Sequence, residues 1–587
     1  MLLQKSELIA CALIILFASL GLATPLAVAD SPSGKSGILI PRDLVIQEPF
    51  GATIHHVFKS VSRDQAKAFQ LARAYNLQWI RVGFQRRVIQ PHPNILQWNI
   101  MDFTIESARN AGVNILGLLE YNVGWASTAP NTFQSESYIF MPQIESWKSY
   151  VRDLVGHYKE SVTYWEVWNE PDIAPFWKPE PNPRDYFRLL QATYEAAKQG
   201  NPNCRILGFS TTSPPSGFTE AVLRMGGAQF CDIISYHSYC PYVKEGAPPE
   251  NYLLSVLAEL DALIRKYNGG NKKPIWITEI GYNLNPAVLR LVNKEQQANY
   301  LQRVYLLALG SGIVQGVLWH ELIEGSPGKG EDYGILEKMD NPYPAALALK
   351  NLIEQLGASP HLLGELSFSD RDLYGYVFEK DGKRILALWC AFGSQKLELN
   401  FGDAKTSGTP RDGIQTYPAA TDSRGTFSVL LNEAPIFLQT NASLDQINSS
   451  LISITNTTAN FSAPAYGILI GSKNDQSYLF GDWQSPEVSN PPAGPDLRHL
   501  FANCRWSGAD SGIRFPIDPR KRYLFQLSYF ANPSLPSQKK EIYINGKYFN
   551  TLKASGWNLF ESVVDSSFWN NQDIAYITFK VDRKSVV

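Results

Sequence analysis

Short apolar runs alternate with longer amphipathic stretches over residues 51–356, and this alternation limits the possible folds more than any other feature. Eight runs rich in β-branched and aromatic residues lie at 51–57, 77–84, 113–122, 162–171, 204–210, 230–239, 274–282 and 313–321. Stretches typical of helices follow them at 62–75, 100–111, 143–160, 183–199, 217–225, 250–267, 293–310 and 343–356. Parallel strands buried on both faces have such near-continuous apolar runs. Eight strand–helix pairs therefore predict an α/β fold, a closed (β/α)8 TIM barrel.

An open, doubly wound parallel sheet is the alternative arrangement of alternating strands and helices. Such a sheet usually carries a glycine-rich, phosphate-binding turn after its first strand. In this chain that position holds His55-His56-Val57. The barrel is therefore the favoured fold.

The pattern changes to alternating strands after the eighth predicted helix. The segment 373–392 alternates around Asp381-Gly382, which is a strong signal for a hairpin. We expect a small β-sandwich over residues 357–440, followed over 441–463 by a linker rich in serine, threonine and asparagine. Strand-like runs resume over 464–587 and predict a second all-β domain, jelly-roll-like and a possible carbohydrate-binding module.

The N-terminal segment carries an apolar run of 16 residues, 8–23, followed by the small-x-small sequence Ala27-Val28-Ala29. This pattern predicts a signal peptide over residues 1–29, with the barrel domain over 30–356. The segment could just span a bilayer, so an uncleaved N-terminal anchor is the alternative. Both interpretations predict a secreted, periplasmic or cell-surface protein with no other contact with a membrane.

The charge balance argues against a nucleic-acid partner. The chain has 53 Lys and Arg residues and 55 Asp and Glu residues, a net charge of −2, whereas a nucleic-acid-binding domain needs a basic surface. Aromatic residues make up 12% of the chain. That content permits stacking on flat neutral ligands such as sugars, but does not by itself indicate them.

Two carboxylates fall at the ends of predicted strands, where the active sites of TIM barrels lie. Strand four ends in Trp165-Glu166-Val167-Trp168-Asn169-Glu170-Pro171, and strand seven ends in Ile277-Thr278-Glu279-Ile280-Gly281-Tyr282. These strands lie on opposite sides of an eight-stranded ring, so Glu170 and Glu279 can face each other across its mouth. Cleavage of a glycosidic bond needs such a pair: one carboxyl group protonates the leaving oxygen, and the other attacks the anomeric carbon or activates water.

Neighbouring residues suit the two different tasks of this pair. An attacking carboxylate must stay ionised, which a nearby cation favours, and Arg81 ends the second predicted strand. A carboxyl group that donates a proton needs a raised pKa, which aromatic surroundings such as Trp168 favour.

Trp-Asn-Glu-Pro on strand four and Thr-Glu-Ile-Gly-Tyr on strand seven resemble the paired signatures of clan A glycoside hydrolases. The resemblance is strongest to glycoside hydrolase family 39 and its bacterial relatives that act on exopolysaccharides, and it extends from the barrel to the end of the β-sandwich. It implies a retaining mechanism through a covalent glycosyl-enzyme, with Glu279 as nucleophile and Glu170 as acid/base. It further implies that Asn169 bonds the sugar 2-hydroxyl, that Trp319 forms the floor of the sugar subsite, and that His237 is a polar neighbour of the nucleophile.

Other residues at or beyond the strand ends are candidates for substrate binding. Adjacent residues of a strand face opposite ways, so at most one of His55 and His56 lines the pocket, and we expect His55. The aromatic candidates are Tyr121 and Trp125 after strand three, Trp177 after the acid/base, and Tyr282 after the nucleophile. For each ring, core packing is the competing interpretation. Trp276 has the opposite strand parity to Glu279 and is expected to face the helices.

A poly- or oligosaccharide is the expected partner, and three other functions are alternatives. A metal-dependent hydrolase is one, because His55, His237 and His320 lie at strand ends. The sequence has neither His-x-His on strand one nor HExxH, so no metal or other cofactor is expected. The second is a barrel that binds carbohydrate without cleaving it. The third is transglycosylation, which uses the same intermediate as hydrolysis.

Overall fold

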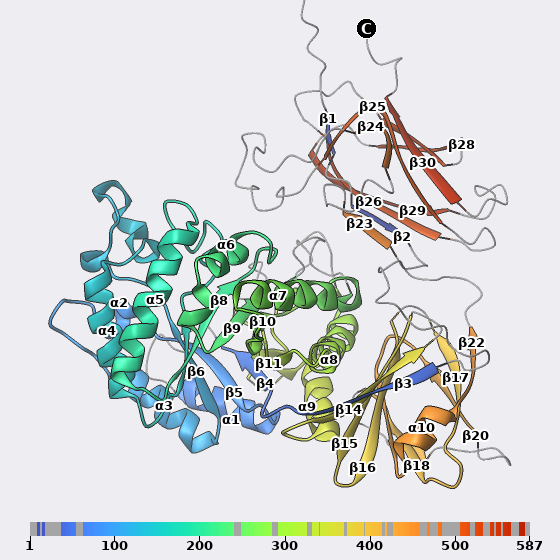
Figure 1. The fold of residues 1–587 in the computed structure, drawn as a ribbon, viewed down its shortest axis with the longest axis horizontal. Coiled ribbons are helices and arrows are strands. Elements are labelled where there is room, and N and C mark those ends of the chain that lie inside the picture. Colours follow the sequence, from blue (N-terminus) through green and yellow to red (C-terminus); the bar gives the residue numbers. More distant parts are fainter. Residues whose placement is uncertain are drawn as a thin grey trace, which may run out of the picture.

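The chain forms a barrel, a β-sandwich and a further pair of β-sheets (Figure 1). The structure is a computed structural model. It describes residues 37–54, 63–239, 248–284, 292–325, 332–339, 341–368, 372–391, 394–411 and 426–456. Elsewhere it describes residue 413, residues 417–418 and the short strands before residue 18 and after residue 465.

Eight parallel strands close into a barrel in the order in which they occur along the chain. They are β4 (Phe50–Thr53), β5 (Trp79–Gly83), β6 (Asn114–Leu119), β7 (Tyr164–Val167), β8 (Arg205–Thr211), β9 (Ile233–His237), β10 (Ile275–Ile280) and β11 (Val314–Trp319). The last strand pairs with the first, with Trp319 opposite Ala52, which closes the ring. Each strand overlaps one of the predicted apolar runs, and the predicted (β/α)8 barrel is confirmed.

Helices surround the barrel, and all of those described except α2 overlap the predicted helical stretches. They are α1 (Arg63–Ala74), α2 (Arg86–Ile89), α3 (Asn99–Ala111), α4 (Ile144–His157), α5 (Pro183–Gly200), α6 (Phe218–Arg224), α7 (Leu253–Tyr267), α8 (Lys294–Gly310) and α9 (Pro344–Leu356). Single turns of 3-10 helix are η1 (Gly124–Ala126), η3 (Gly227–Phe230) and η4 (Pro249–Asn251), and η2 (Asn131–Ile139) is longer. Local sequence sets the helix starts. The Asn182 side chain accepts hydrogen bonds from the first turn of α5, and Asn293 and Gln296 form a capping box on α8.

Aromatic side chains fill the end of the barrel opposite its mouth. The rings of Trp79, Tyr164 and Trp276 contact one another, with centroids 4.8–5.4 Å apart. The prediction that Trp276 faces the helices is therefore wrong. The register of β10 with both neighbouring strands shifts after its third residue, which marks a β-bulge. The bulge changes the alternation, so Trp276 faces the interior and Glu279 still reaches the mouth.

The β-sandwich has a seven-stranded and a three-stranded sheet, in the orders β19-β18-β21-β16-β15-β14-β3 and β20-β17-β22. Its elements are β3 (Gly37–Val45), β14 (His361–Phe368), β15 (Leu373–Lys380), β16 (Lys383–Cys390), β17 (Gln395–Asn400), β18 (Thr406–Thr409), β19 (Tyr417–Pro418), β20 (Thr426–Leu431), β21 (Ile436–Thr440), α10 (Leu444–Ser450) and β22 (Leu451–Asn456). A small hairpin of β12 (Leu336–Lys338) and β13 (Asn341–Pro342) precedes α9. The predicted hairpin turn is present, because Asp381 and Gly382 have φ angles of 52° and 74° between β15 and β16.

Two predicted boundaries of the sandwich differ from the structure. Strand β3, assigned to the barrel by its position in the chain, pairs along its length with β14 as an edge strand of the sandwich. The segment 441–463, expected to be a linker, contains α10 and β22, and β22 pairs with β17. Its apolar residues, such as the buried Ile447, pack into the sandwich core. The linker prediction rested on the polar composition of the segment, which does not reveal this packing.

A buried ion pair of the barrel is hydrogen-bonded to the sandwich. Arg303 on α8 donates from Nε to Glu250 Oε1 at 2.7 Å and from Nη2 to Glu250 Oε2. From β16, Trp389 Nε1 donates to the same Glu250 Oε1 at 2.8 Å. Both charged side chains are almost fully buried. Because a buried charge is costly unless it is paired and hydrogen-bonded, these contacts fix the sandwich against the barrel.

We expect Trp389→Phe to lower the free energy of unfolding by about 1–3 kcal/mol, because Glu250 loses a donor in a buried site. Chemical denaturation of the variant and the wild type measures the change. Trp98→Phe is the control, since the half-buried Trp98 ring stacks on His157 at the barrel surface. A loss no larger in Trp389→Phe than in the control would contradict this role of the hydrogen bond.

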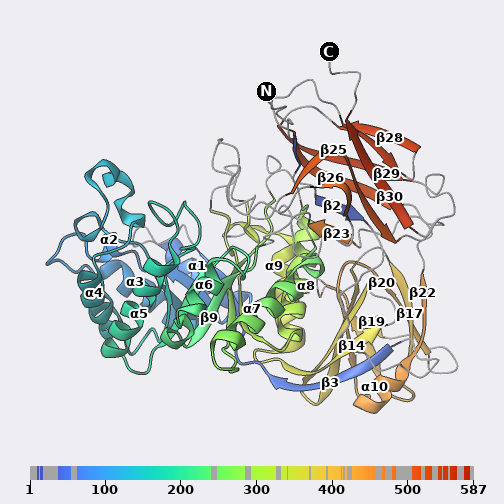
Figure 2. The same ribbon diagram turned by 45° about the horizontal axis from the view of Figure 1, so that its top comes forward.

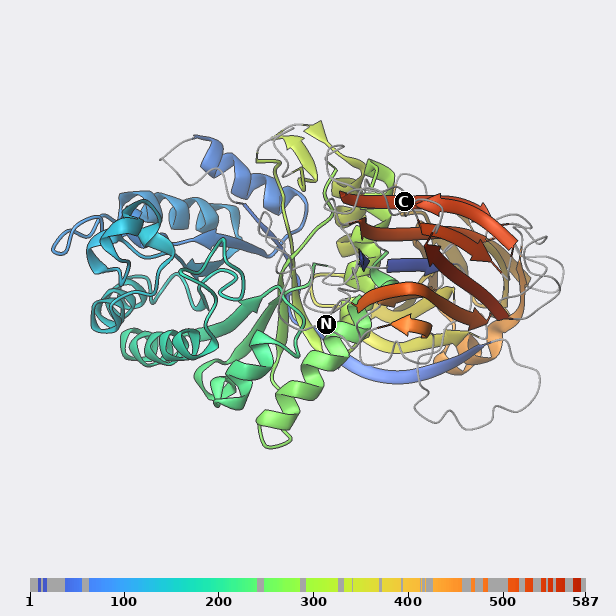
Figure 3. The same ribbon diagram turned by 90° about the horizontal axis from the view of Figure 1, so that it is seen from above.

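Antiparallel strands near the C-terminus form two further sheets, in agreement with the predicted all-β domain. Figures 2 and 3 show them beside the β-sandwich, at the end of the molecule away from α2–α5. The strands are β23 (Tyr466–Leu469), β24 (Leu479–Trp483), β25 (Arg505–Pro516), β26 (Tyr523–Ala531), β27 (Lys540–Ile544), β28 (Lys547–Leu552), β29 (Gly556–Val564) and β30 (Ile574–Val581).

The N-terminal apolar run contributes two strands to these sheets. Strand β1 (Ile9–Cys11) pairs with β25, and β2 (Ile14–Phe17) lies between β23 and β26. Apolar, β-branched residues suit both a signal peptide and a buried strand, so the predicted cleavage after Ala29 stays a prediction. Among the helices that the structure describes, none has the length and hydropathy to cross a membrane.

Candidate active site

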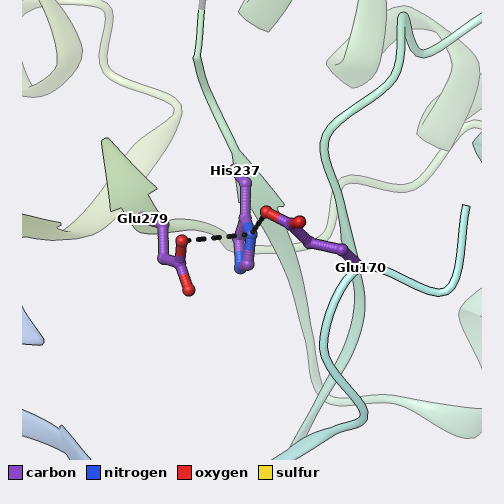
Figure 4. A group of neighbouring side chains, drawn as sticks. All are labelled: Glu170, His237 and Glu279. Atoms are coloured by element: carbon purple, nitrogen blue, oxygen red, sulfur yellow. Dashed lines mark hydrogen bonds and ion pairs between the residues drawn. The ribbon is translucent and has the colours of Figure 1, made fainter. Parts of the chain in front are cut away.

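Glu170 and Glu279 face each other at the carboxyl ends of β7 and β10, with His237 of β9 between them (Figure 4). His237 Nδ1 lies 2.7 Å from Glu170 Oε1 and 3.6 Å from Glu279 Oε2. One nitrogen or oxygen atom from each of the three residues lies within 4.8 Å of the other two. All three side chains are buried. The structure thus brings together the carboxylate pair that the sequence predicts.

The backbone around Glu170 has an unusual conformation. Trp168 and Glu170 have φ angles of 66° and 45°, in the left-handed region that non-glycine residues rarely adopt. The end of β8 holds this segment: Glu170 N–H donates to Ser210 O at 3.1 Å, and Ser210 Oγ donates to Trp168 O at 2.7 Å. Asp172 accepts hydrogen bonds from two backbone N–H groups that follow β8. These contacts offset a backbone cost of about 1–3 kcal/mol per residue and fix the direction of the Glu170 side chain.

Arg81, on β5, connects Glu279 to two other polar groups. Its Nη1 donates to Glu279 Oε1, its Nε to Glu166 Oε2 at 2.5 Å, and its Nη2 to Asn169 Oδ1 at 2.9 Å. Thr278 Oγ1 donates to the other oxygen of Glu166 at 2.7 Å. Burial works against the charge of Arg81, but Glu166 and Glu279 raise its pKa, so the guanidinium stays charged. The cation beside Glu279 favours the ionised form that a nucleophile needs, as the sequence predicts.

Tyr239 also bonds to Glu279, through a hydroxyl group that donates to Oε2 at 3.1 Å. Sequence analysis did not select Tyr239 or Glu166. Tyr239 stands two residues after His237, and Glu166 stands two residues after the inward-facing Tyr164. Residues two apart along a strand face the same way, so this spacing is the signal that could have identified both.

Glu170 and His237 retain a proton to higher pH than isolated groups would. Burial raises the pKa of Glu170; His237 lowers it, the charge of Glu279 raises it, and the net shift is upward. Burial lowers the pKa of His237, but Glu279 and Glu170 outweigh this effect and raise it. The pair therefore holds a proton next to the site, as a general acid requires.

A third carboxyl group, that of Glu120, lies at the mouth directly after β6 and was not selected by sequence analysis. Glu120 is 7% exposed. Burial raises the pKa of Glu120 to about 7, although Arg81 and a hydrogen bond from Gln85 Nε2, at 3.3 Å, lower it.

We expect Glu120→Gln to stabilise the protein at pH 8 but to change little at pH 4. The pKa of Glu120 is about 7 in the folded chain against an ordinary value of 4.5, so its protonated form favours folding. That contribution is complete below about pH 4.5 and is lost as the pH rises through about 7, a difference of about 3 kcal/mol at pH 8. Denaturation of both proteins at pH 4, 6 and 8 measures it. Glu106→Gln, on the exposed face of α3, is the control; a difference that does not vary with pH would contradict the shift.

The orientation of the Asn169 amide suits the role in binding a sugar hydroxyl that the family resemblance implies. Its Oδ1 must face Arg81, because a guanidinium only donates hydrogen bonds. Within the described part of the chain, no hydrogen bond engages the Nδ2 group. That group is therefore free to donate to a ligand.

Tyr121 follows Glu120 at the end of β6, and its contact with substrate stays a prediction. Burial raises its pKa, and the charges of Glu120, Glu170 and Glu279 raise it further, which places the ring within their electrostatic reach. Tyr121 is half-buried and lies parallel to Phe176, at a centroid distance of 6.3 Å. The two rings pack together beyond the ends of β6 and β7.

Trp319 and Tyr282 pack together at the ends of β11 and β10. Their rings are 6.2 Å apart, and both are buried. Trp319 Nε1 has no hydrogen-bond partner among the described residues, whereas the hydroxyl groups of Tyr282 and Tyr252 lie 3.2 Å apart. A sugar can stack on Trp319 only after a side chain that covers it moves, so its role as the subsite floor stays a prediction.

Trp177 belongs to the core rather than to a sugar-binding surface, which corrects the prediction. It is 1% exposed and packs edge-on against Trp168 at 5.4 Å and Tyr186 of α5 at 6.3 Å. Core packing, the competing interpretation, explains this ring, because the loop after β7 folds back onto α5.

Trp125 attaches the loop after β6 to the segment around α2. Its Nε1 donates to Pro91 O at 3.1 Å, and the Arg86 guanidinium lies 4.9 Å from its ring centroid. One ring face is therefore already covered, and substrate contact at Trp125 stays a prediction. His55 lies outside the described residues.

Glu170, His237 and Glu279 are close enough to coordinate a single cation. The protein already supplies donors to these atoms: His237 bonds to Glu170, while Arg81 and Tyr239 bond to Glu279. A metal ion would have to displace them and would lie near the charged Arg81. The arrangement therefore suits acid/base chemistry better than metal binding.

A (β/α)8 barrel with opposed carboxylates after strands four and seven defines the structural class of this chain. No protein-family model matches the chain. A family 39 glycoside hydrolase from Bacteroides cellulosilyticus WH2 superposes with a TM-score of 0.55 and 21% identity, covering 67% of this chain and 81% of that one. A glucosidase from Croceicoccus marinus superposes with a TM-score of 0.50 and 13% identity, covering 70% and 97%.

Curated sequences are also similar to this chain, and a beta-xylosidase is among them. A beta-xylosidase from Geobacillus stearothermophilus is 28% identical over 166 residues, which are 24% of this chain and 31% of that protein. The match thus spans about a third of the curated relative. At the level of the fold, these comparisons confirm the predicted resemblance to family 39 glycoside hydrolases.

Proposed function

We propose that the protein is a retaining glycoside hydrolase that cleaves O-glycosidic bonds of a poly- or oligosaccharide. The observation that carries this proposal is the buried pair Glu170 and Glu279, whose carboxyl oxygens lie within 4.8 Å of each other across His237. Retaining enzymes hold their two carboxyl groups about 5–5.5 Å apart, whereas inverting enzymes leave about 6.5–9.5 Å for a water molecule.

In the first step Glu279 attacks the anomeric carbon while Glu170 gives its proton to the leaving glycosidic oxygen. The bond from the anomeric carbon to that oxygen breaks as the bond to Glu279 forms. Arg81 and Tyr239 hold Glu279 in position through hydrogen bonds to its two oxygens. The raised pKa of Glu170 keeps the proton available.

In the second step Glu170, now ionised, removes a proton from water, and the water oxygen attacks the anomeric carbon. The ester bond to Glu279 breaks, and two inversions give net retention. Esterification neutralises Glu279, whose charge raised the pKa of Glu170, so the same carboxyl group becomes a better-ionised base. Asn169 supports both steps by donating from its Nδ2 to the sugar 2-hydroxyl.

The names of the similar proteins suggest xylosides and glucosides as first substrates.

We propose that the protein acts outside the cytoplasm, because residues 8–23 and Ala27-Val28-Ala29 form a signal-peptide pattern. Sequencing of the exported protein tests this, with Asp30 expected as its first residue. The C-terminal sheets are proposed to bind polysaccharide, which a pull-down of the full chain on insoluble xylan and cellulose would test, with a chain that lacks residues 464–587 for comparison.

Incubation with 4-nitrophenyl β-xyloside and β-glucoside, and with xylan, β-glucan and mannan, tests the main proposal. The anomeric configuration of the first-formed sugar is read by NMR before mutarotation. We expect hydrolysis with a β product from a β-glycoside. An α product would overturn the retaining mechanism, and binding without cleavage of any substrate would favour a carbohydrate-binding barrel. Products longer than the substrate would show transfer of the glycosyl group to a sugar.

A further inference from the structure

Glu120 is directed into the mouth of the barrel. Leu116 belongs to the inward-facing cluster that includes Trp79, and the residue four positions further along the same strand direction is Glu120. On the neighbouring strand Gly83 has the parity of Arg81, which also points inward. A Cβ atom at Gly83 would lie 2.0 Å from Glu120 Oε1. The missing side chain at Gly83 thus leaves the space that the Glu120 carboxyl group occupies.

Within the described part of the chain, Glu120 makes few of the hydrogen bonds that a carboxylate can accept. The one hydrogen bond to its carboxyl group there is the 3.3 Å contact from Gln85 Nε2, whereas a carboxylate has about four acceptor sites. Arg81 is close enough to act on Glu120 electrostatically, but its donors bond to other residues. A buried carboxyl group with unused acceptor sites is costly to the fold, and hydroxyl groups of a bound sugar would satisfy it.

Acidic groups outnumber basic groups around this point. The acidic residues are Glu120, Glu166, Glu170 and Glu279, and the basic ones are Arg81 and His237. Arg87 also acts on Glu120, but it is exposed, and its guanidinium lies 5.2 Å from the ring centroid of Tyr138. A sugar carboxylate placed in this site would face a like charge and find no free cation among these groups, and like charges at close range repel.

We propose that Glu120 is a specificity-determining residue of the glycone subsite, where it accepts hydrogen bonds from hydroxyl groups of a neutral sugar and excludes uronic acids. This inference rests on the proposed glycosidase function, because it assigns Glu120 to the sugar that Glu279 attacks. It also explains why the chain keeps a buried acid beside a glycine rather than filling the space with an apolar side chain.

The test compares wild type and Glu120→Gln on 4-nitrophenyl β-glucoside, β-xyloside and β-glucuronide at pH 8, where the Glu120 carboxyl group, with a pKa of about 7, is mostly ionised. For the neutral glycosides we expect kcat/KM to fall by roughly 10–100-fold, mainly through KM, as one charged hydrogen bond is lost. The ratio of glucuronide to glucoside kcat/KM is expected to rise about 10-fold, since the repelling charge is removed. Glu106→Gln, on the exposed face of α3, should change neither value.

Three results would overturn the inference while leaving the proposed function intact: wild type cleaving the glucuronide as well as the glucoside, unchanged kinetics in Glu120→Gln, or an equal loss on all three glycosides, which a merely structural role would cause. If wild type cleaves none of them, the binding of D-xylose and D-glucose is measured by tryptophan fluorescence. Absence of binding would overturn both proposals, and binding that Glu120→Gln leaves unchanged would overturn this one. Binding that Glu120→Gln weakens, with glucuronate excluded by wild type, would support it.

Discussion

Replacing Glu279 with alanine is expected to lower kcat by roughly 10⁴–10⁶-fold, the range seen when an enzyme with a covalent intermediate loses a residue of its nucleophilic machinery. In the proposed mechanism the substitution removes the atom that attacks the anomeric carbon, so neither half of the reaction can proceed. It also leaves a space beside Arg81 and Tyr239, which bond to Glu279 in the wild type. Sodium azide should enter this space, attack in place of the carboxylate and restore cleavage of a 4-nitrophenyl β-glycoside.

The configuration of the azide product distinguishes the two carboxyl groups. In Glu279→Ala a single displacement by azide gives an α-glycosyl azide from a β-glycoside. In Glu170→Ala the glycosyl-enzyme on Glu279 still forms with an activated leaving group, and azide then attacks it to give the β-glycosyl azide. NMR of the products reads the difference, and Glu106→Ala should retain full activity. Full activity in either carboxylate variant, or the same azide anomer from both, would refute the assigned roles.

Replacing Arg81 with methionine is expected to cost about 3–5 kcal/mol of stability, because it leaves the buried Glu166 without its cation. The same change should lower kcat at least about 100-fold, since Glu279 loses a donor and Asn169 loses the contact that orients its amide. Urea denaturation and steady-state kinetics measure the two effects.

The double variant Arg81→Met/Glu166→Gln separates stability from activity. Removing both charges should recover most of the stability lost in Arg81→Met, because no unpaired buried charge remains at Glu166. Activity should stay low, because Glu279 and Asn169 still lack their donor. Recovery of activity together with stability would mean that Arg81 acts only on the fold.

The barrel could be predicted from the sequence because its signals are local. The strands are buried on both faces, so apolar runs mark them, and caps such as Asn182 mark the start of helices. The positions of Glu170 and Glu279 followed from the same alternation, since each stands at the end of a run. Arg81 and His237 were found by that rule as well.

The features that sequence analysis missed depend on contacts or register that strand alternation does not encode. The bulge in β10 sends Trp276 inward, against its parity with Glu279. Trp177 follows Glu170 by seven residues in the sequence, but the loop turns its ring into the core. The role proposed for Glu120 depends on its position next to Gly83, a residue of the neighbouring strand.

Strand β3 has a consequence for how this molecule can be divided. It precedes the barrel in the chain, yet it pairs with β14, which follows the barrel. The sandwich sheet is therefore completed by a strand more than 300 residues away, and its pairing closes a loop that contains the whole barrel. Neither the barrel nor the sandwich can therefore be separated from the other by cutting the chain at a single position. Long-range pairing of this kind slows folding and makes neighbouring units unfold together. Proteolysis that removes β3 should therefore destabilise the sandwich strands that lie farthest from β3, although no peptide bond in those strands is cut.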